Sequence, residues 1–171
     1  MDTKRRILSA AVAGAMILVI GQGTSSAKRT RGSSSPVVGV WHIAERATAG
    51  SDSEKNTNPQ PGVRIFTQRY YSFTEVTADA PRPDFPAQGS TDKQRADAWG
   101  PFTGQAGTYE IKGNELTTKR IAAKNPSVMK AGSFTTYTFR MEGNDTLWLT
   151  EKTSESGPVQ TPLTIKLTRL E

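Results

Sequence analysis

The sequence contains no cysteine and a single histidine among its 171 residues. The absence of cysteine excludes a disulfide scaffold, a thiolate zinc site and a cysteine nucleophile. With one histidine, the usual zinc ligand sets cannot be assembled either. A Ser-His-Asp triad would have to use His42, and the sequence has no G-x-S-x-G motif to supply its nucleophile. We therefore expect no metal, no cofactor and no catalytic triad.

The excess of positive charge is small, and outside one short segment it is dispersed along the chain. Lys and Arg number 22 against 16 Asp and Glu, a formal net charge of +6. Nucleic-acid-binding proteins usually concentrate basic residues on one face and interleave them with aromatic ones. Here the only dense basic cluster is Lys28-Arg29-Thr30-Arg31. We therefore expect no nucleic acid partner.

Residues 1–27 have the three-part organisation of an export signal. A basic start at residues 4–6 precedes an apolar run at residues 7–20, and small residues follow up to Ala27. The apolar run is short for a bilayer, which takes about 20 apolar residues to cross. We expect cleavage after Ala27, no stable membrane insertion afterwards, and a secreted or periplasmic protein. An uncleaved membrane anchor is the alternative.

A basic and then serine-rich segment, residues 28–36, follows the expected signal. Such a composition buries too little apolar surface to fold, so we expect a disordered linker. The folded domain is expected over residues 37–171. A domain of that length buries a hydrophobic core without help from metals or disulfides.

Short alternating strands joined by Gly, Asn and Asp turns run through this domain, a pattern typical of a small barrel or sandwich. The expected strands cover residues 37–47, 62–76, 107–112, 115–121, 133–142, 146–152 and 163–169. Pairing the last strand with the first would remove two exposed sheet edges. A bend within the long second strand would raise the count to about eight, a number that suits a closed barrel. We predict an all-β fold, a small antiparallel up-and-down β-barrel of about 7–8 strands.

One short helix is expected between the second and third of these strands. Thr91 offers an N-cap, and Gln94 takes the third helical position, which is the spacing of a capping box. Gly100 and Pro101 then stop the helix. The sequence therefore predicts a helix over residues 92–99.

The first strand carries Gly39-Val40-Trp41, and the last strand carries Arg169. This pair resembles the lipocalin signature, a G-x-W on the first strand and an arginine near the end of the barrel. In that family the arginine packs over the tryptophan at the closed end, a contact worth about 0.5–2 kcal/mol. The resemblance to bacterial lipocalin-like (calycin) proteins extends over residues 37–169, through segments 99–102, 107–110, 123–126 and 145–149. It implies that Gly39, Trp41 and Arg169 are structural and close the barrel.

Aromatic side chains and one arginine form the predicted ligand site. We expect Tyr71, Tyr109, Tyr137 and Trp148 to offer apolar walls to the interior, and for Tyr109 and Tyr137 this follows from the alternation of side chains along a strand. Arg120 shares the less polar face of its strand with Leu116 and Thr118, and it is the expected polar anchor for a carboxylate or similar head group. The alternative is that the charged groups point outward and the aromatic rings are simply core.

The predicted function is that of an exported lipocalin-like protein. It would bind a small, largely apolar molecule, hydrophobic or amphipathic, in the barrel interior. Entry would be at the open end, near the loops at residues 81–86 and 122–132. Two alternatives stay open. One is a barrel enzyme that catalyses a cyclisation or isomerisation without metal or triad, which the sequence favours less than binding. The other is a packed, ligand-free barrel that acts through its surface as an envelope or interaction protein.

Overall fold

The computed structural model describes residues 35–50 and 53–171. The expected signal at residues 1–27 and residues 28–34 of the expected linker lie outside the described residues. Within the described part of the chain, no helix has the length and apolar character needed to cross a lipid bilayer.

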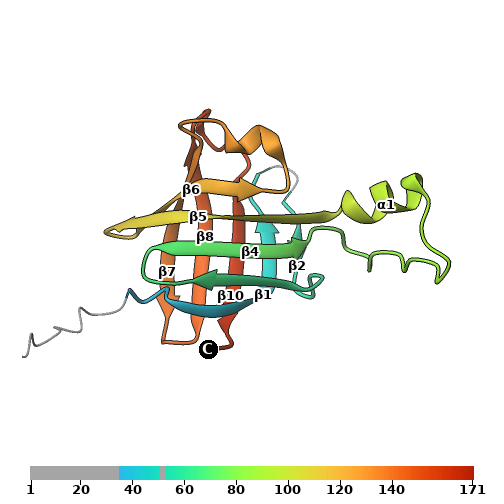
Figure 1. Cartoon of the computed structure of the whole chain (residues 1–171). Coiled ribbons are helices and arrows are strands. Elements are labelled where there is room, and N and C mark those ends of the chain that lie inside the picture. Colours follow the sequence, from blue (N-terminus) through green and yellow to red (C-terminus); the bar gives the residue numbers. More distant parts are fainter. Residues whose placement is uncertain (1–34, 51–52) are drawn as a thin grey trace, which may run out of the picture. The chain divides into compact units, whose positions relative to one another are not determined.

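Eight antiparallel strands form a closed barrel (Figure 1). They are β1 (Gly39–Thr48), β3 (Gly62–Phe66), β4 (Tyr70–Val76), β5 (Phe102–Lys112), β6 (Glu115–Ala123), β7 (Phe134–Glu142), β8 (Thr146–Ser154) and β10 (Leu163–Arg169). Two short strands, β2 (Lys55–Asn56) and β9 (Gly157–Pro158), pair with β1 and β8 beside the ring. The predicted all-β, up-and-down barrel is confirmed.

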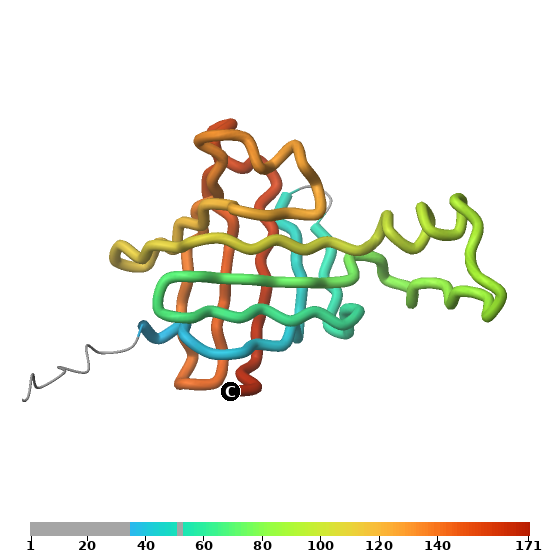
Figure 2. Tube along the Cα trace, in the orientation of Figure 1, coloured from blue at the N-terminus to red at the C-terminus, as the bar shows by residue number. Residues whose placement is uncertain are grey.

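The last strand closes the ring, as the path of the chain in Figure 2 shows. On one side β10 pairs with β1, where Arg169 lies opposite Trp41. On its other side β10 pairs with β8, where Leu167 lies opposite Leu147. Because both edges of β10 are hydrogen-bonded, the sheet satisfies its own backbone groups.

The long second strand expected over residues 62–76 is divided into β3 and β4. The division is a tight turn in which Thr67 N donates to Tyr70 O at 2.8 Å and Tyr70 N donates to Thr67 Oγ1 at 3.1 Å. A threonine hydroxyl that bonds nearby backbone in this way favours a turn over a continuous strand. This turn supplies the eighth strand, and it places the predicted helix between β4 and β5.

Helix α1 (Asp92–Trp99) begins as its sequence predicts. The Thr91 side chain accepts from Gln94 N, and the Gln94 side chain accepts from Thr91 N, which completes the capping box. Gly100 keeps right-handed angles, φ −47° and ψ −61°, so it is not a left-handed cap. Pro101, which has no N–H to continue the helical hydrogen bonds, follows directly. A short 3-10 helix, η1 (Pro126–Met129), lies between β6 and β7.

The barrel has two different ends. We call the closed end the one where β1 begins and β10 finishes. The open end is the opposite one, where four longer connections join β1 to β3, β4 to β5, β6 to β7 and β8 to β10. In Figures 1 and 2 the connection that contains α1 extends away from the barrel wall.

The interior changes character between these ends. Towards the closed end it is mainly apolar, and its largest fully buried side chains are Val37, Trp41, Ile43, Leu116, Leu147, Leu149, Ile165 and Leu167. From the middle to the open end, polar or charged side chains are buried as well: Arg64, Glu75, Thr118, Ser133 and Thr135. The apolar part supplies the buried surface that stabilises a barrel of this size. The polar part provides charged and hydrogen-bonding groups near the open end.

Candidate functional site

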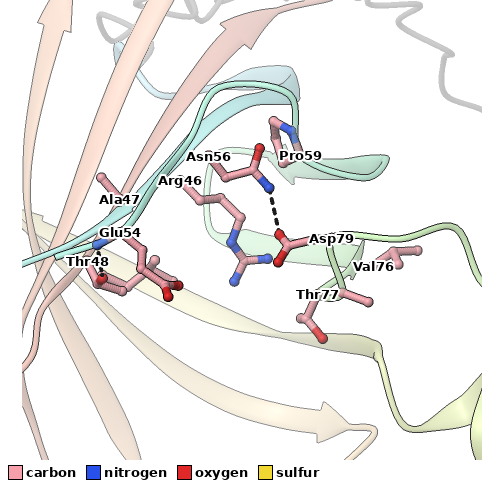
Figure 3. Close-up of a pocket in the computed structure, with 11 residues that line it drawn as sticks. Arg46, Ala47, Thr48, Glu54, Asn56, Pro59, Val76, Thr77 and Asp79 are labelled. Atoms are coloured by element: carbon pink, nitrogen blue, oxygen red, sulfur yellow. Dashed lines mark hydrogen bonds between the residues drawn. The ribbon is translucent and has the colours of Figure 1, made fainter. Parts of the chain in front are cut away.

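A pocket of about 200 Å³ lies at the open end (Figure 3). It is formed by the end of β1, the segment that contains β2, the end of β4 and the start of β10. Its apolar lining consists of Ala47, Pro59, Val76, Ala78 and Leu163. Its polar lining consists of Arg46, Thr48, Glu54, Asn56, Thr77 and Asp79.

A bulge in β1 turns Arg46 towards the barrel interior. Trp41 and Ile43 are buried, so strict alternation would turn Glu45 inward and Arg46 outward. Between Ile43 and Glu45 the register with β10 shifts by one residue. A β-bulge reverses which side chains face inward beyond it. Arg46 therefore meets Glu75 inside, while Glu45 pairs with Lys55 at 3.1 Å.

Arg46, Glu75 and Arg64 form an ionic triad below the pocket. Glu75 Oε2 lies 3.2 Å from Arg64 Nη2, and Glu75 Oε1 lies 3.6 Å from Arg46 Nη1. The Glu75 and Arg64 side chains are 5% and 6% exposed, whereas Arg46 is 19% exposed towards the pocket. The Arg64 guanidinium also stacks 4.3 Å from the Phe73 ring centroid. Ion pairs this buried are strongly coupled, because water screens them little.

The triad leaves donors without partners. Arg46 Nη1 and Arg64 Nε are buried and make no hydrogen bond to residues 35–50 or 53–171. The 3.6 Å separation between Arg46 Nη1 and Glu75 Oε1 is an ion pair but is longer than a hydrogen bond. A buried N–H without an acceptor costs about 1–3 kcal/mol, and more when it is charged. Nη1 faces Glu75, so an oxygen that enters the pocket meets the other, accessible part of the Arg46 side chain, which is 19% exposed.

The rim of the pocket is acidic. Asp79 Oδ1 accepts from Asn56 Nδ2 at 2.9 Å, which ties the segment containing β2 to the connection that follows β4. Glu54, the other acidic residue, is positioned through its backbone, whose N–H donates to Thr48 Oγ1 at 3.1 Å. Figure 3 shows the Arg46 side chain reaching towards Asp79. The described residues hold no group of three or more His, Asp or Glu suited to a metal ion.

Arg120, the predicted polar anchor, lies inside the open end in a second polar cluster. Its Nε donates to Gln105 Oε1 at 3.1 Å, its Nη1 donates to Ser133 Oγ at 2.8 Å, and its Nη2 donates to Thr135 Oγ1. Glu155 Oε2 lies 3.8 Å from Arg120 Nη1. Hydrogen bonds to backbone N–H groups, beginning with its own, lower the pKa of the Glu155 carboxyl, and the Arg120 charge adds to this. With three oxygen acceptors, Arg120 fastens loops together, and its role as a ligand anchor stays a prediction.

Two of the predicted wall residues, Tyr71 and Tyr137, lie together in the middle of the barrel. Gln105 Nε2 donates to the Tyr71 hydroxyl at 3.1 Å, which links this tyrosine to the Arg120 cluster. Burial raises the pKa of both phenols. At Tyr137 the positive charge of Arg64 partly offsets that rise, while the negative charge of Glu151 adds to it. The raised pKa values keep both phenols protonated, and therefore uncharged, at neutral pH.

Side chains fill the space around these tyrosines. The cavity between Arg64, Tyr71, Leu116, Tyr137 and their neighbours has a volume of about 10 Å³. That volume is roughly what one water molecule requires. A largely apolar ligand, as the sequence predicts, would need these side chains to repack before it could enter.

Tyr109 and Trp148 do not join the other predicted wall residues. Tyr109 lies at the closed end, where its hydroxyl donates to Thr67 O at 2.6 Å and its ring meets Phe66 edge-on at 5.4 Å. Trp148 is on the outer face of the barrel, with Arg140 and Lys166 at 4.5 and 5.3 Å from its ring.

The predicted placement of Trp148 inside the barrel is wrong. Its strand neighbours Leu147 and Leu149 are 0% and 1% exposed and occupy the interior. Since successive side chains of a strand point to opposite faces, the residue between them must point outward. The alternation of Leu147 and Leu149 around Trp148 is a sequence signal for this outward placement.

The residues predicted to be structural meet at the closed end. Arg169 lies over the Trp41 ring, and Trp41 Nε1 donates to Val37 O at 2.8 Å. Gly39 has φ +147°, and a Cβ at this position would overlap Arg169 Nη1 and Glu171 O. A glycine is therefore required here both by the backbone angle and by the space that Arg169 occupies.

Arg46 and Glu75 are the site residues that sequence reasoning missed. Both sit in strands whose other inward positions are apolar or aromatic, so each looked like one more surface charge. A signal existed for Glu75, because Tyr71, Phe73 and Glu75 share one face of the strand. For Arg46 the sequence carried no such signal, because the bulge that turns this side chain inward cannot be recognised from the neighbouring residues.

A closed eight-strand up-and-down barrel, with a tryptophan of the first strand under an arginine of the last, is a lipocalin-like fold. No protein-family model matches the sequence. No curated protein matches it either.

Three solved structures are similar to this chain. A lipocalin-like protein from Bacteroides uniformis is 12% identical, with 80% of this chain and 100% of that one covered and a TM-score of 0.44. A redesigned β-barrel is 13% identical, with 81% and 95% covered and a TM-score of 0.40. A de novo fluorescence-activating β-barrel is 12% identical, with 80% and 95% covered and a TM-score of 0.38.

Proposed function

We propose that this chain is an exported lipocalin-like protein that binds a small molecule in the pocket at the open end of its barrel. The observation that carries this proposal is Arg46. Its side chain lines a pocket of about 200 Å³, is 19% exposed and makes no hydrogen bond to the described residues. A ligand oxygen in the pocket would give the accessible part of this guanidinium an acceptor. Export rests on the signal-like sequence of residues 1–27.

The open-end pocket fits a ligand better than the barrel interior does. The interior cavity of about 10 Å³ has no space for the apolar molecule expected from the sequence, whereas the pocket has about twenty times that volume. Val76 and Leu163 still offer an apolar wall there. The ligand is therefore amphipathic, with a polar group at Arg46.

The test begins with the full chain expressed in an export-competent host. The exported protein is purified gently, weighed by native mass spectrometry and then extracted with solvent. We expect the mass of a protein that begins at Lys28, increased by the mass of one bound compound. Solvent extraction should release this compound as a small organic molecule. A protein mass that retains residues 1–27 would contradict the expected cleavage.

A matched pair of variants locates the ligand. Ala78 lines the pocket, so Ala78→Trp should fill it and remove the added mass. Ala80→Trp adds the same side chain at an exposed position two residues away and should keep the added mass. Retention of the added mass in Ala78→Trp would place the ligand elsewhere and reject the open-end pocket.

The filled interior favours a second candidate function, a ligand-free barrel that acts through its surface. It predicts a clean apo mass for the exported protein and for both variants. It also predicts that no extractable small molecule accompanies the protein. The same experiment therefore separates the two candidates.

A further inference from the structure

Building on the proposed function, we propose that the open-end pocket selects a small zwitterion. The carboxylate of this ligand binds Arg46, and its ammonium group faces Glu54 and Asp79. The inference concerns the chemical class of the ligand and stands on the distribution of charge along the pocket.

The inner end of the pocket is positive. Among the described residues, Glu75 is the one carboxylate within 4.0 Å of the Arg46 or Arg64 guanidinium. Two arginines thus share a single buried carboxylate. Glu151, the next acidic side chain of the interior, accepts from Leu163 N at 3.3 Å and lies beyond 4.0 Å from both guanidinium groups. Arg46 therefore shares Glu75 with Arg64 and can take a second anionic partner.

Arg46 is the member of the triad that an anion can reach. The Arg46 side chain is 19% exposed, whereas that of Arg64 is 6% exposed. Of these two arginines, Arg46 lines the pocket and Arg64 does not. A guanidinium presents its N–H groups in a fork that matches the two oxygens of a carboxylate. The accessible part of the Arg46 guanidinium can donate to a ligand carboxylate while Nη1 keeps its ion pair with Glu75.

The outer end of the pocket is negative. Glu54 and Asp79 line the rim and are exposed to solvent. Asp79 Oδ1 is oriented by Asn56 Nδ2 at 2.9 Å, which fixes this carboxylate at the mouth. A ligand whose carboxylate binds Arg46 therefore has two acidic groups nearby, which favour a protonated amine next to that carboxylate.

The volume and the apolar lining of the pocket limit the size and shape of its ligand. A volume of about 200 Å³ excludes a lipid with long acyl chains and accommodates a molecule of amino-acid size. Val76, Pro59 and Leu163 give this molecule an aliphatic surface to pack against. The pocket is therefore complementary to a small zwitterion with an aliphatic body.

Four matched compounds test the charge preference. They are leucine, which is zwitterionic; N-acetylleucine, which keeps only the carboxylate; leucinamide, which keeps only the ammonium; and N-acetylleucinamide, which is neutral. Each is titrated into the exported protein, and the backbone amide signals of the pocket residues are followed by NMR. We expect leucine to bind at least about tenfold more tightly than the other three, because each lost charge-assisted hydrogen bond costs roughly ten- to a hundredfold.

Variants assign each charge to its partner. Arg46→Gln should weaken leucine and N-acetylleucine by roughly ten- to a hundredfold and leave leucinamide unchanged. Lys55→Gln removes a cation from the same end, but Lys55 pairs with Glu45, so it should change no affinity. The double variant Glu54→Gln with Asp79→Asn leaves the buried triad intact. It should weaken leucine and leucinamide but spare N-acetylleucine.

The outcomes separate this inference from the function on which it rests. Equal affinity for all four compounds would overturn the preference for a zwitterion, and so would an affinity for leucine that Arg46→Gln leaves unchanged. In both cases the proposed function, small-molecule binding in this pocket, would survive. Binding of none of the four would also overturn the preference for a zwitterion. In that case the added mass on the exported protein, and its loss in Ala78→Trp, decides whether the proposed function survives.

Discussion

The Arg169 guanidinium lies 4.0 Å from the centroid of the Trp41 ring, and the two residues face each other across the β1–β10 pairing that closes the barrel. Arg169 also donates to the carbonyls of Pro36, Val38 and Asn144, at 3.1, 2.8 and 2.6 Å. One side chain therefore fastens the segment before β1 and the turn between β7 and β8 to the last strand.

Replacement of this arginine should measurably destabilise the barrel. Arg169→Met removes the cation–π contact and four side-chain hydrogen bonds, the fourth to Glu171 O at 3.2 Å, so we expect the free energy of unfolding to fall by about 2–4 kcal/mol. Urea denaturation followed by tryptophan fluorescence measures the change. Arg140→Met, which removes an arginine from the exposed face of Trp148, is the control and should cost less than about 1 kcal/mol. Equal losses in the two variants would contradict a closing role for Arg169.

A second prediction concerns the glycine beside this contact. Gly39→Ala meets both a positive φ and the Arg169 side chain, so we expect a loss of about 3 kcal/mol in stability. Gly157→Ala is matched in having a positive φ, +101°, but its Cβ would meet no described atom within 4 Å. It should cost about 1–2 kcal/mol, the strain of the backbone alone. Thermal and urea unfolding of the two variants should separate these values, and a smaller loss for Gly39→Ala would contradict the steric argument.

The ionic triad gives a third prediction. Glu75→Gln leaves two buried guanidinium groups without their counter-ion, and we expect a loss of about 3–5 kcal/mol in the free energy of unfolding. Glu45→Gln breaks the ion pair with Lys55, whose side chain is 61% exposed, and should cost less than about 1 kcal/mol. Chemical denaturation at neutral pH measures both. If Glu75→Gln unfolds the protein altogether, Arg46→Gln, which leaves the Arg64 to Glu75 bond in place, should show a smaller loss.

Alkaline pH provides the fourth test. Burial raises the pKa of Tyr137 above its ordinary value of 10.0, so the folded state holds this proton more tightly than the unfolded state does. The stability linked to Tyr137 is therefore complete below about pH 10 and is lost as the pH rises through the folded-state pKa. We expect the free energy of unfolding to fall with pH above about 10 and to fall less steeply in Tyr137→Phe. Tyr70→Phe, which removes an exposed phenol, controls for the loss of a tyrosine as such. An unchanged slope in Tyr137→Phe would contradict the prediction.

Local chemistry in the sequence predicted much of the fold. The helix at residues 92–99 and its capping box follow from Thr91 and Gln94, because a cap is built from neighbours within one turn. The strands follow from residues that alternate with period two and from the turns between them. Tyr71 and Tyr137 could be placed inside from their own strands, since neither lies beyond a bulge on its own strand.

The open-end pocket depended on contacts between strands that are distant in sequence. One extra residue in β1 exchanges the faces of Glu45 and Arg46, and only the register with β10 reveals it. Glu75 becomes a shared counter-ion because β4 lies opposite β3, while β1 pairs with the other edge of β3.

The sequence by itself determined the strands, the helix and the type of barrel, because each depends on the periodicity and capping of nearby residues. The tertiary structure alone decided that side chains fill the space around Tyr71 and Tyr137 and that Arg46 turns into the open-end pocket. Whether a barrel is hollow depends on how side chains from all its strands interlock, and that packing is a property of no single strand.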